Sequence, residues 1–147
     1  MTESDWTSVW DDRFQPAFWT AKHAMTNAAD AVYRRHGVRL GQQYLLMCLW
    51  GRDGLTPGEI AATTGLATPT VTRSATRMAA SGLLRREPDP VDGRLVRLWL
   101  TDEGRRLRRV LNAEISQLSE RALAGLSDAE RESLVAMLHR IRANLSR

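Results

Sequence analysis

The run ATPTVTRSATR, residues 67–77, is rich in hydroxyl groups and carries two arginines. In a helix, where successive residues advance by about 100°, Val71, Ala75 and Met78 would share one face. We expect that face to be buried, which leaves threonine and arginine side chains on the opposite face and its flanks. Arginine can donate to the two acceptors of guanine, and threonine can donate to a phosphate or contact the methyl group of thymine. The run therefore predicts a helix that reads the major groove of DNA, and an ordinary solvated helix face is the alternative. The candidate contact residues are Thr68, Pro69, Thr70, Thr72, Arg73, Thr76 and Arg77.

A further candidate, Arg94, lies near the tip of a predicted hairpin. The segments LLRRE (83–87) and RLVRLWL (94–100) have the composition of strands, and PDPVDG between them is rich in turn residues. A guanidinium at such a tip could enter the minor groove, where narrow A·T tracts concentrate negative potential. We expect Asp92 to pair with an arginine or with loop amides and thereby to fix the tip. The apolar residues that should share one face of the second strand are Val96, Leu98 and Leu100.

The distribution of charge agrees with these candidates. The formal net charge of the chain is only +4, yet the segment from Arg73 to Arg109 holds ten arginines and five acidic residues. The basic excess therefore belongs to one segment, as expected for a surface that faces phosphates. A solvated basic face without a partner is the alternative.

A short helix should precede the arginine-bearing one. Thr56 can cap it, Pro57 suits its first position, and Glu59 can reach back to complete a capping box. We expect this helix to end near Thr64, because Gly65 follows.

The second short helix should begin at a similar signal. Thr68 and Pro69 offer another cap and first-turn pair, and the helix should run to about Ser81 and end at Gly82. Two short helices separated by a glycine turn fit a helix-turn-helix, in which Val71 would anchor the second helix.

Longer amphipathic helices are predicted on both sides of this unit. An N-terminal helix should close at Gly37, a second helix should span roughly 40–51, Thr101 should cap a fifth, and SDAE (127–130) should open the last with a capping box. The N-terminal apolar stripe comprises Trp10, Phe14, Ala17, Phe18, Ala21, Met25, Ala28 and Val32. The two C-terminal stripes comprise Leu107, Leu111, Ile115, Leu118 and Ala122, and then Leu134, Met137, Leu138, Ile141 and Leu145.

These terminal stripes lie at opposite ends of the chain, and neither end makes a convincing core alone. A two-fold homodimer would bury both, and a monomer with the terminal helices folded over the middle is the alternative. The predicted fold is mostly α with a small β-hairpin wing, a winged helix-turn-helix plus terminal dimerisation helices. We expect an N-terminal dimerisation helix over 1–37, a DNA-binding region over 40–101 and C-terminal dimerisation helices over 102–147, in one continuous structural domain.

Other classes of protein find little support. No apolar run could span a membrane, and the acidic start MTESDWTSVWDD is unlike a signal peptide, so a cytoplasmic protein is expected. Cys48 is the single cysteine and stands among apolar residues; we expect an inert thiol, with a redox or ligand-lining role as the alternative. His23, His36 and His139 are scattered, which predicts no metal site. No catalytic or nucleotide-binding motif occurs, so neither an enzyme nor a cofactor is expected.

The segment LTPGEIAATTGLATPTVTRSATRMAASGLLRREPDPVDGRLVRLWLTDEG, residues 55–104, resembles the winged helix-turn-helix of the MarR (multiple antibiotic resistance regulator) family. The most specific matches are VTR in the second short helix, GLLRR, the D-x-R at Asp92–Arg94 and the LT-x-x-G at Leu100–Gly104. The resemblance implies a homodimeric transcriptional regulator, usually a repressor, which binds double-stranded DNA at a palindromic operator. A winged-helix module that binds protein instead of specific DNA is the alternative.

Family resemblance also implies release of DNA by a small, often phenolic, anion. Family members that sense peroxides use a cysteine near the start of the first helix, and none stands there in this chain. Core packing is the alternative role for each of the residues that could line an effector pocket, which are Trp19, His23, Tyr44 and Met47.

Overall fold

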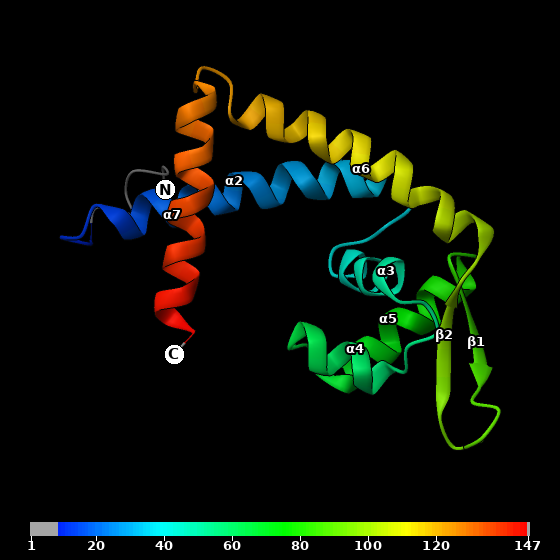
Figure 1. The fold of residues 1–147 in the computed structure, drawn as a ribbon. Helices are drawn as coiled ribbons and strands as arrows, with labels where there is room; N and C mark the ends of the chain where they lie inside the picture. Colours follow the sequence, from blue (N-terminus) through cyan, green and yellow to red (C-terminus); the bar gives the residue numbers. More distant parts are fainter. Residues whose placement is uncertain (1–8, 147) are drawn as a thin grey trace. The chain divides into compact units, whose positions relative to one another are not determined.

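The computed structural model describes residues 9–146, so the first eight residues of the predicted N-terminal region lie outside the described part. Helices α2 to α5 come first, the strands β1 and β2 form an antiparallel pair, and helices α6 and α7 follow (Figure 1). The predicted mostly α fold with a hairpin is confirmed. The described chain divides into two compact units, one ending at Ile115 and one beginning at Ser116. The elements are α2 (Phe14–Arg35), α3 (Gln42–Gly51), α4 (Pro57–Thr64), α5 (Thr68–Ala80), β1 (Leu84–Pro88), β2 (Val96–Leu100), α6 (Asp102–Ala122) and α7 (Asp128–Leu145).

Two helix starts differ from the sequence-based prediction. Trp10 precedes α2, because the Asp12 carboxylate accepts the backbone N–H groups of Phe14 (2.6 Å) and Gln15 (3.4 Å) and so sets the first turn there. The predicted cap at Thr68 is also wrong. Thr68 is already the first residue of α5, and the residue in the cap position is Ala67, which has no side-chain acceptor.

The core of the first unit forms under the predicted inward face of α5. Val71, Ala75 and Met78 are all buried, which confirms the helical periodicity of the run. They pack with α3, α4, the strands and the first half of α6. Leu107 and Leu111 of the predicted α6 stripe belong to this core. Its largest fully buried side chains are Leu45, Leu46, Leu49, Ile60, Met78, Leu98, Leu107 and Leu111.

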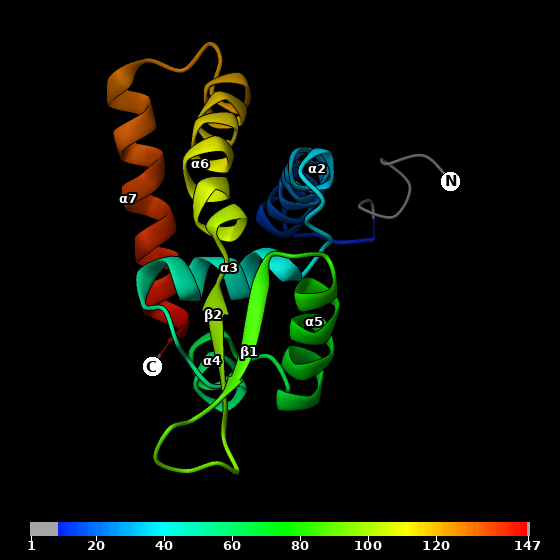
Figure 2. The same ribbon diagram turned by 90° about the vertical axis from the view of Figure 1, so that its right-hand side faces the viewer.

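The hairpin, called the wing below, consists of β1, β2 and the loop 89–95. Its register pairs Leu84 with Leu100 and Pro88 with Val96. Leu98 forms an additional antiparallel bridge with Leu55, which ties the wing to the segment before α4. Figure 1 and Figure 2 show that the loop between the strands projects away from α3.

The turn before α4 fits closely beneath the wing. Gly54 has a φ of 75°, in the left-handed region that favours glycine. A Cβ on Gly54 would lie 2.5 Å from Cη2 of Trp99, so the indole of β2 occupies the space of the missing side chain. With tryptophan at residue 99, glycine therefore suits this position both by its backbone conformation and by its size.

The start of α6 is held against the turn between α5 and β1. As predicted, Thr101 caps α6: its hydroxyl accepts the backbone N–H of Gly104 at 3.1 Å. The indole nitrogen of Trp50 donates to the carbonyl of Gly104 at 2.9 Å. A Cβ on Gly104 would lie 2.4 Å from the carbonyl oxygen of Leu83. Gly104 thus permits a close approach of two backbone segments.

The second unit contains the C-terminal end of α6 and the whole of α7. The predicted capping box at Ser127 and Glu130 is present. Arg131 donates to the carboxylate of Glu120 at 2.8 Å and to the carbonyl of Leu123 at 3.2 Å, which fixes the connection between the two helical segments. None of the α7 residues is buried within the described chain.

No helix in residues 9–146 is both long enough and apolar enough to cross a membrane.

Candidate nucleic-acid interface

The outer face of α5 presents its polar groups to solvent. Thr68, Pro69, Arg73, Thr76 and Arg77 are exposed. Within residues 9–146, no hydrogen bond or ion pair engages the guanidinium of Arg73 or Arg77. These two cations therefore keep all their donors available.

The threonines of α5 differ in how far they are exposed. Thr70 and Thr72 are half-buried on the flanks of the helix. The hydroxyl of Thr76 donates to the carbonyl of Thr72 at 3.0 Å, so its hydrogen is engaged and its oxygen remains available as an acceptor.

At the tip of the wing, Arg94 is held by Asp92. The Nε of Arg94 donates to Asp92 Oδ1 at 3.0 Å and its Nη2 donates to Oδ2 at 3.2 Å. The Arg94 amide also donates to Oδ1, at 3.1 Å. These bonds lower the pKa of Asp92, with the Arg94 guanidinium as the largest cause. Asp92 thus meets both an arginine and a loop amide, while the Arg94 side chain stays 91% exposed.

Asp89 organises the loop, and the sequence interpretation gave it no role. Its Oδ1 accepts the backbone N–H groups of Val91 and Asp92, each at 2.8 Å. Its Oδ2 accepts from Nε of Arg97 at 2.5 Å. The bond from the Asp92 amide, the Arg97 guanidinium and the Val91 amide lower the pKa of Asp89 to about 2. The signal in the sequence was an aspartate placed to cap its own turn, D-P-x-D.

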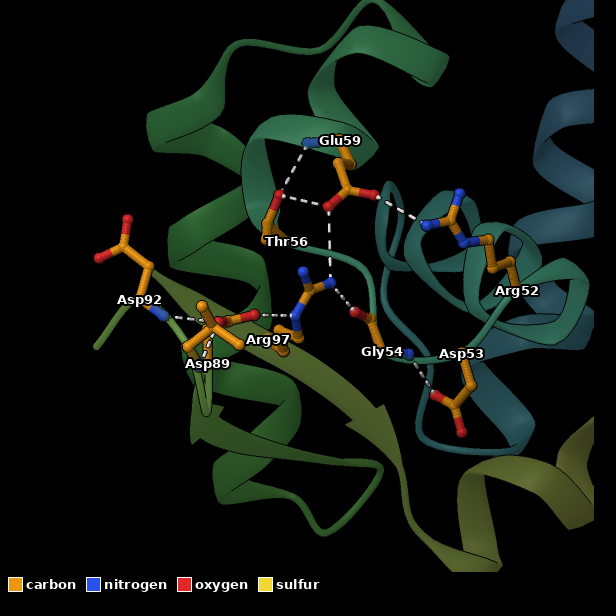
Figure 3. Close-up of polar contacts among 9 residues, drawn as sticks. Arg52, Asp53, Gly54, Thr56, Glu59, Asp89, Asp92 and Arg97 are labelled. Carbon is orange, nitrogen blue, oxygen red and sulfur yellow. Dashed lines mark hydrogen bonds and ion pairs between the residues drawn. The ribbon is translucent and has the colours of Figure 1, made fainter. Parts of the chain in front are cut away.

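Arg97 links this loop to α4 and to the turn before it (Figure 3). Its Nη1 donates to the carbonyl of Gly54 at 2.8 Å and lies 3.6 Å from the carboxylate of Glu59.

Only half of the predicted capping box forms at α4. Thr56 Oγ1 accepts from the Glu59 amide at 3.2 Å, but the Glu59 carboxylate accepts from the Thr56 hydroxyl and faces Arg97 and Arg52 instead of the Thr56 amide. The guanidinium groups of Arg52 and Arg97 attract the Glu59 carboxylate, which explains why it does not reach the Thr56 amide.

The pKa of Asp89 predicts a dependence of stability on pH. The folded pKa, about 2, lies below the ordinary value of 3.8, so ionised Asp89 stabilises the fold fully above about pH 4, and this contribution is lost as the pH falls toward 2. Asp89→Asn removes the titrating group. The difference in unfolding free energy between the parent and this variant, from urea titrations, should therefore be smaller at about pH 3 than at about pH 6. An equal difference at both values would contradict the assignment.

The four candidate effector residues are not brought together. Trp19 and His23 line a hollow of about 540 Å³ on α2 with Lys22 and Thr26. Met47 lines a different hollow, of about 620 Å³, between α3 and α4. Tyr44 lines neither of these two hollows.

Cys48 also lines the hollow between α3 and α4. It is half-buried, and burial raises the pKa of its thiol. Across residues 9–146, histidine, cysteine and acidic side chains form no group of three that could hold a metal ion.

Comparison with known proteins gives consistent matches. A model of the MarR family matches residues 36–95. An uncharacterised HTH-type transcriptional regulator of Mycobacterium bovis is 34% identical over 98 residues, which are 66% of this chain and 68% of that protein. The HTH-type transcriptional regulator TtmR of Methylorubrum extorquens is 31% identical over 129 residues, 88% of this chain and 65% of that protein. The fold is similar to the crystal structure of a MarR family regulator from Listeria monocytogenes in complex with a 26mer DNA, with a TM-score of 0.75, 17% identity and coverage of 92% of this chain and 90% of that one.

Proposed function

This chain belongs to the MarR family of transcriptional regulators, and from that premise we propose that it binds duplex DNA at a palindromic operator as a homodimeric repressor. The observation that carries the proposal is the pair of unengaged guanidinium groups of Arg73 and Arg77 on the exposed face of α5. Because the opposite face is buried, a rigid helix presents these groups at a fixed spacing, as a major-groove reader requires.

The wing would make the second contact. Asp92 orients the exposed guanidinium of Arg94, which would enter the minor groove or contact its phosphates, beside the segment read by α5. In this arrangement α5 supplies discrimination between sequences and the wing supplies affinity. Thr68, Pro69, Thr70, Thr72 and Thr76 would add contacts to phosphates and base methyl groups.

Binding to genomic fragments tests the proposal most directly. Purified protein should select a small set of fragments from total genomic DNA, each with an imperfect palindrome whose half-site centres lie roughly 10 base pairs apart. The affinity should fall steeply with salt, because Lys and Arg displace counterions from phosphates. Equal affinity for every fragment, or none at all, would favour the alternative of a protein-binding winged helix.

The homodimer is proposed from exposed apolar side chains at both ends of the described chain. On α2, Phe14 and Met25 are exposed, and α7 exposes Met137 and Leu138. These residues belong to the stripes identified in the sequence, and about half of each side chain is exposed. A second copy would remove them from water, at roughly 25 cal/mol per Å² of apolar surface.

Removal of α7 should abolish the dimer. A chain truncated after Gly125 loses the apolar stripe of α7, so light scattering should report a monomer or an aggregate where the full chain gives a dimer. The first unit keeps its buried core, so circular dichroism should still show folded helices. A well-folded dimer after truncation would refute the placement of the interface.

We further propose that a small aromatic anion relieves repression. The hollow on α2 offers an indole at Trp19, a histidine and the Lys22 ammonium, which lies 5.0 Å from the indole ring centre. An aromatic ring could stack there while its anionic group pairs with the ammonium. A panel of phenolates and aromatic carboxylates, each added to the preformed DNA complex, tests this. Trp19→Ala should weaken the response to an active compound and leave DNA affinity unchanged.

A further inference from the structure

Arg97 contacts three separate segments of the DNA-binding unit. Arg97 is the second residue of β2, and its guanidinium reaches Asp89 in the wing loop, the carbonyl of Gly54 before α4, and the carboxylate of Glu59 on α4. Figure 3 shows the side chain between these acceptors. The fork of donors on one planar group suits such a bridge, whereas a single ammonium could not span all three acceptors.

The contacts continue from Arg97 to the tip. Asp89, held by Arg97, accepts the amides of Val91 and Asp92, and Asp92 in turn holds the guanidinium of Arg94. Exposure changes along this series: the side chain of Asp89 is 9% exposed and that of Arg97 28%, whereas that of Arg94 is 91% exposed. The base of the loop is therefore shielded, and its tip is free for a partner.

We propose that Arg97 is a positioning residue for DNA binding, which holds the wing loop through Asp89 so that Arg94 is presented to the duplex. This inference rests on the proposed function. Within the loop 89–95, the backbone hydrogen bonds run from the Asp89 amide to the Leu95 carbonyl (2.9 Å) and from the Leu95 amide to the Asp92 carbonyl (3.0 Å). Without the bridge to α4, the loop would sample other conformations, and binding would have to restrict them at a cost in affinity. Nε and Nη1 of Arg97 already donate within the protein, and the proposed role requires no contact between Arg97 and DNA.

Amide hydrogen exchange in the free protein tests the first step. Arg97→Gln should speed exchange at the Asp92, Arg94 and Leu95 amides by about tenfold or more, since each donates within the ordered loop. Arg85→Gln is the matched control: it removes the same charge from the paired strand, where Arg85 is exposed and faces Glu87 at 3.6 Å. Exchange at the loop amides should not change in the control. Equal exchange in Arg97→Gln and the parent would overturn the proposal.

A double-mutant cycle tests the second step. With operator DNA, Arg97→Gln and Arg94→Ala should each weaken binding by about tenfold, and the double variant should be no weaker than about twentyfold, because both remove the same contact. A loss near one hundredfold would mean independent effects and would overturn the positioning role. Asp89→Asn breaks the bridge from its other end and should reproduce Arg97→Gln, with thermal unfolding used to confirm that both variants fold. If the parent binds no duplex, the proposed function fails, while the exchange data still decide whether Arg97 orders the loop.

Discussion

Replacing Gly104 with alanine should lower the free energy of unfolding by about 2 kcal/mol or more, against the usual effect of this substitution in a helix. Helix propensity alone favours alanine over glycine by about 1 kcal/mol. The added Cβ, however, would lie 2.4 Å from the carbonyl oxygen of Leu83 and 3.2 Å from the side chain of Leu100. Because the nearest atom is backbone, α6 would have to move away from the turn after α5, which also strains the bond from Trp50 to the Gly104 carbonyl.

Gly58→Ala is the matched control for this prediction. Gly58 also lies in the first turn of a helix, α4, and its nearest neighbour would be Thr56 Oγ1 at 3.9 Å, an ordinary contact. This variant should be as stable as the parent or slightly more stable. Urea unfolding followed by circular dichroism measures both. If Gly104→Ala were as stable as Gly58→Ala, the close approach at α6 would not be as tight as described.

In the second prediction, Arg73→Ala and Arg94→Ala should weaken DNA binding in different ways. Arg73 lies on the exposed face of α5, and its loss should remove about 1–3 kcal/mol of discrimination between operator and scrambled duplex if it pairs with a guanine. A dimer would carry this loss in both half-sites. Arg94→Ala should weaken binding to both duplexes alike and reduce the salt slope, because the wing contacts a groove that carries little sequence information.

Affinities for operator and scrambled duplex across a salt series separate the two effects. Arg121→Ala serves as the control, because it removes one exposed positive charge from α6 in the second unit and leaves α5 and the wing intact. It should change neither the discrimination nor the slope appreciably. Unchanged operator affinity in both Arg73→Ala and Arg94→Ala would remove the physical basis of the proposed interface.

Local signals in the sequence predicted the two short helices α4 and α5 well. The cap at Thr56, the turn at Gly65 and the inward face at Val71 all depend on neighbours within four residues, so their chemistry is decided locally. The capping box at Ser127 formed for the same reason. Thr68 was mistaken for a cap because Thr-Pro at a helix start fits two registers that differ by one residue, and Ala67 takes the cap position in the structure.

Contacts that depend on tertiary register could not be predicted. Asp89 and Arg97 meet only because the hairpin pairs Pro88 with Val96, and Glu59 reaches them from another helix. The bridge between Leu55 and Leu98 likewise joins an irregular segment to a strand. The effector candidates Trp19 and Met47 were grouped because they lie on the first two predicted helices, but the structure places them in different hollows. The spacing of residues in the sequence does not indicate which side chains from different elements meet.

The indole of Trp99 over Gly54 also limits the order in which substitutions can accumulate in a lineage. A side chain at residue 54 is accepted only after residue 99 has become smaller, and even then the positive φ restricts the choice to residues such as asparagine. If residue 54 changed first, its new side chain and the indole of Trp99 would clash. We therefore expect substitutions at residues 54 and 99 to be coupled, with residue 99 changing first.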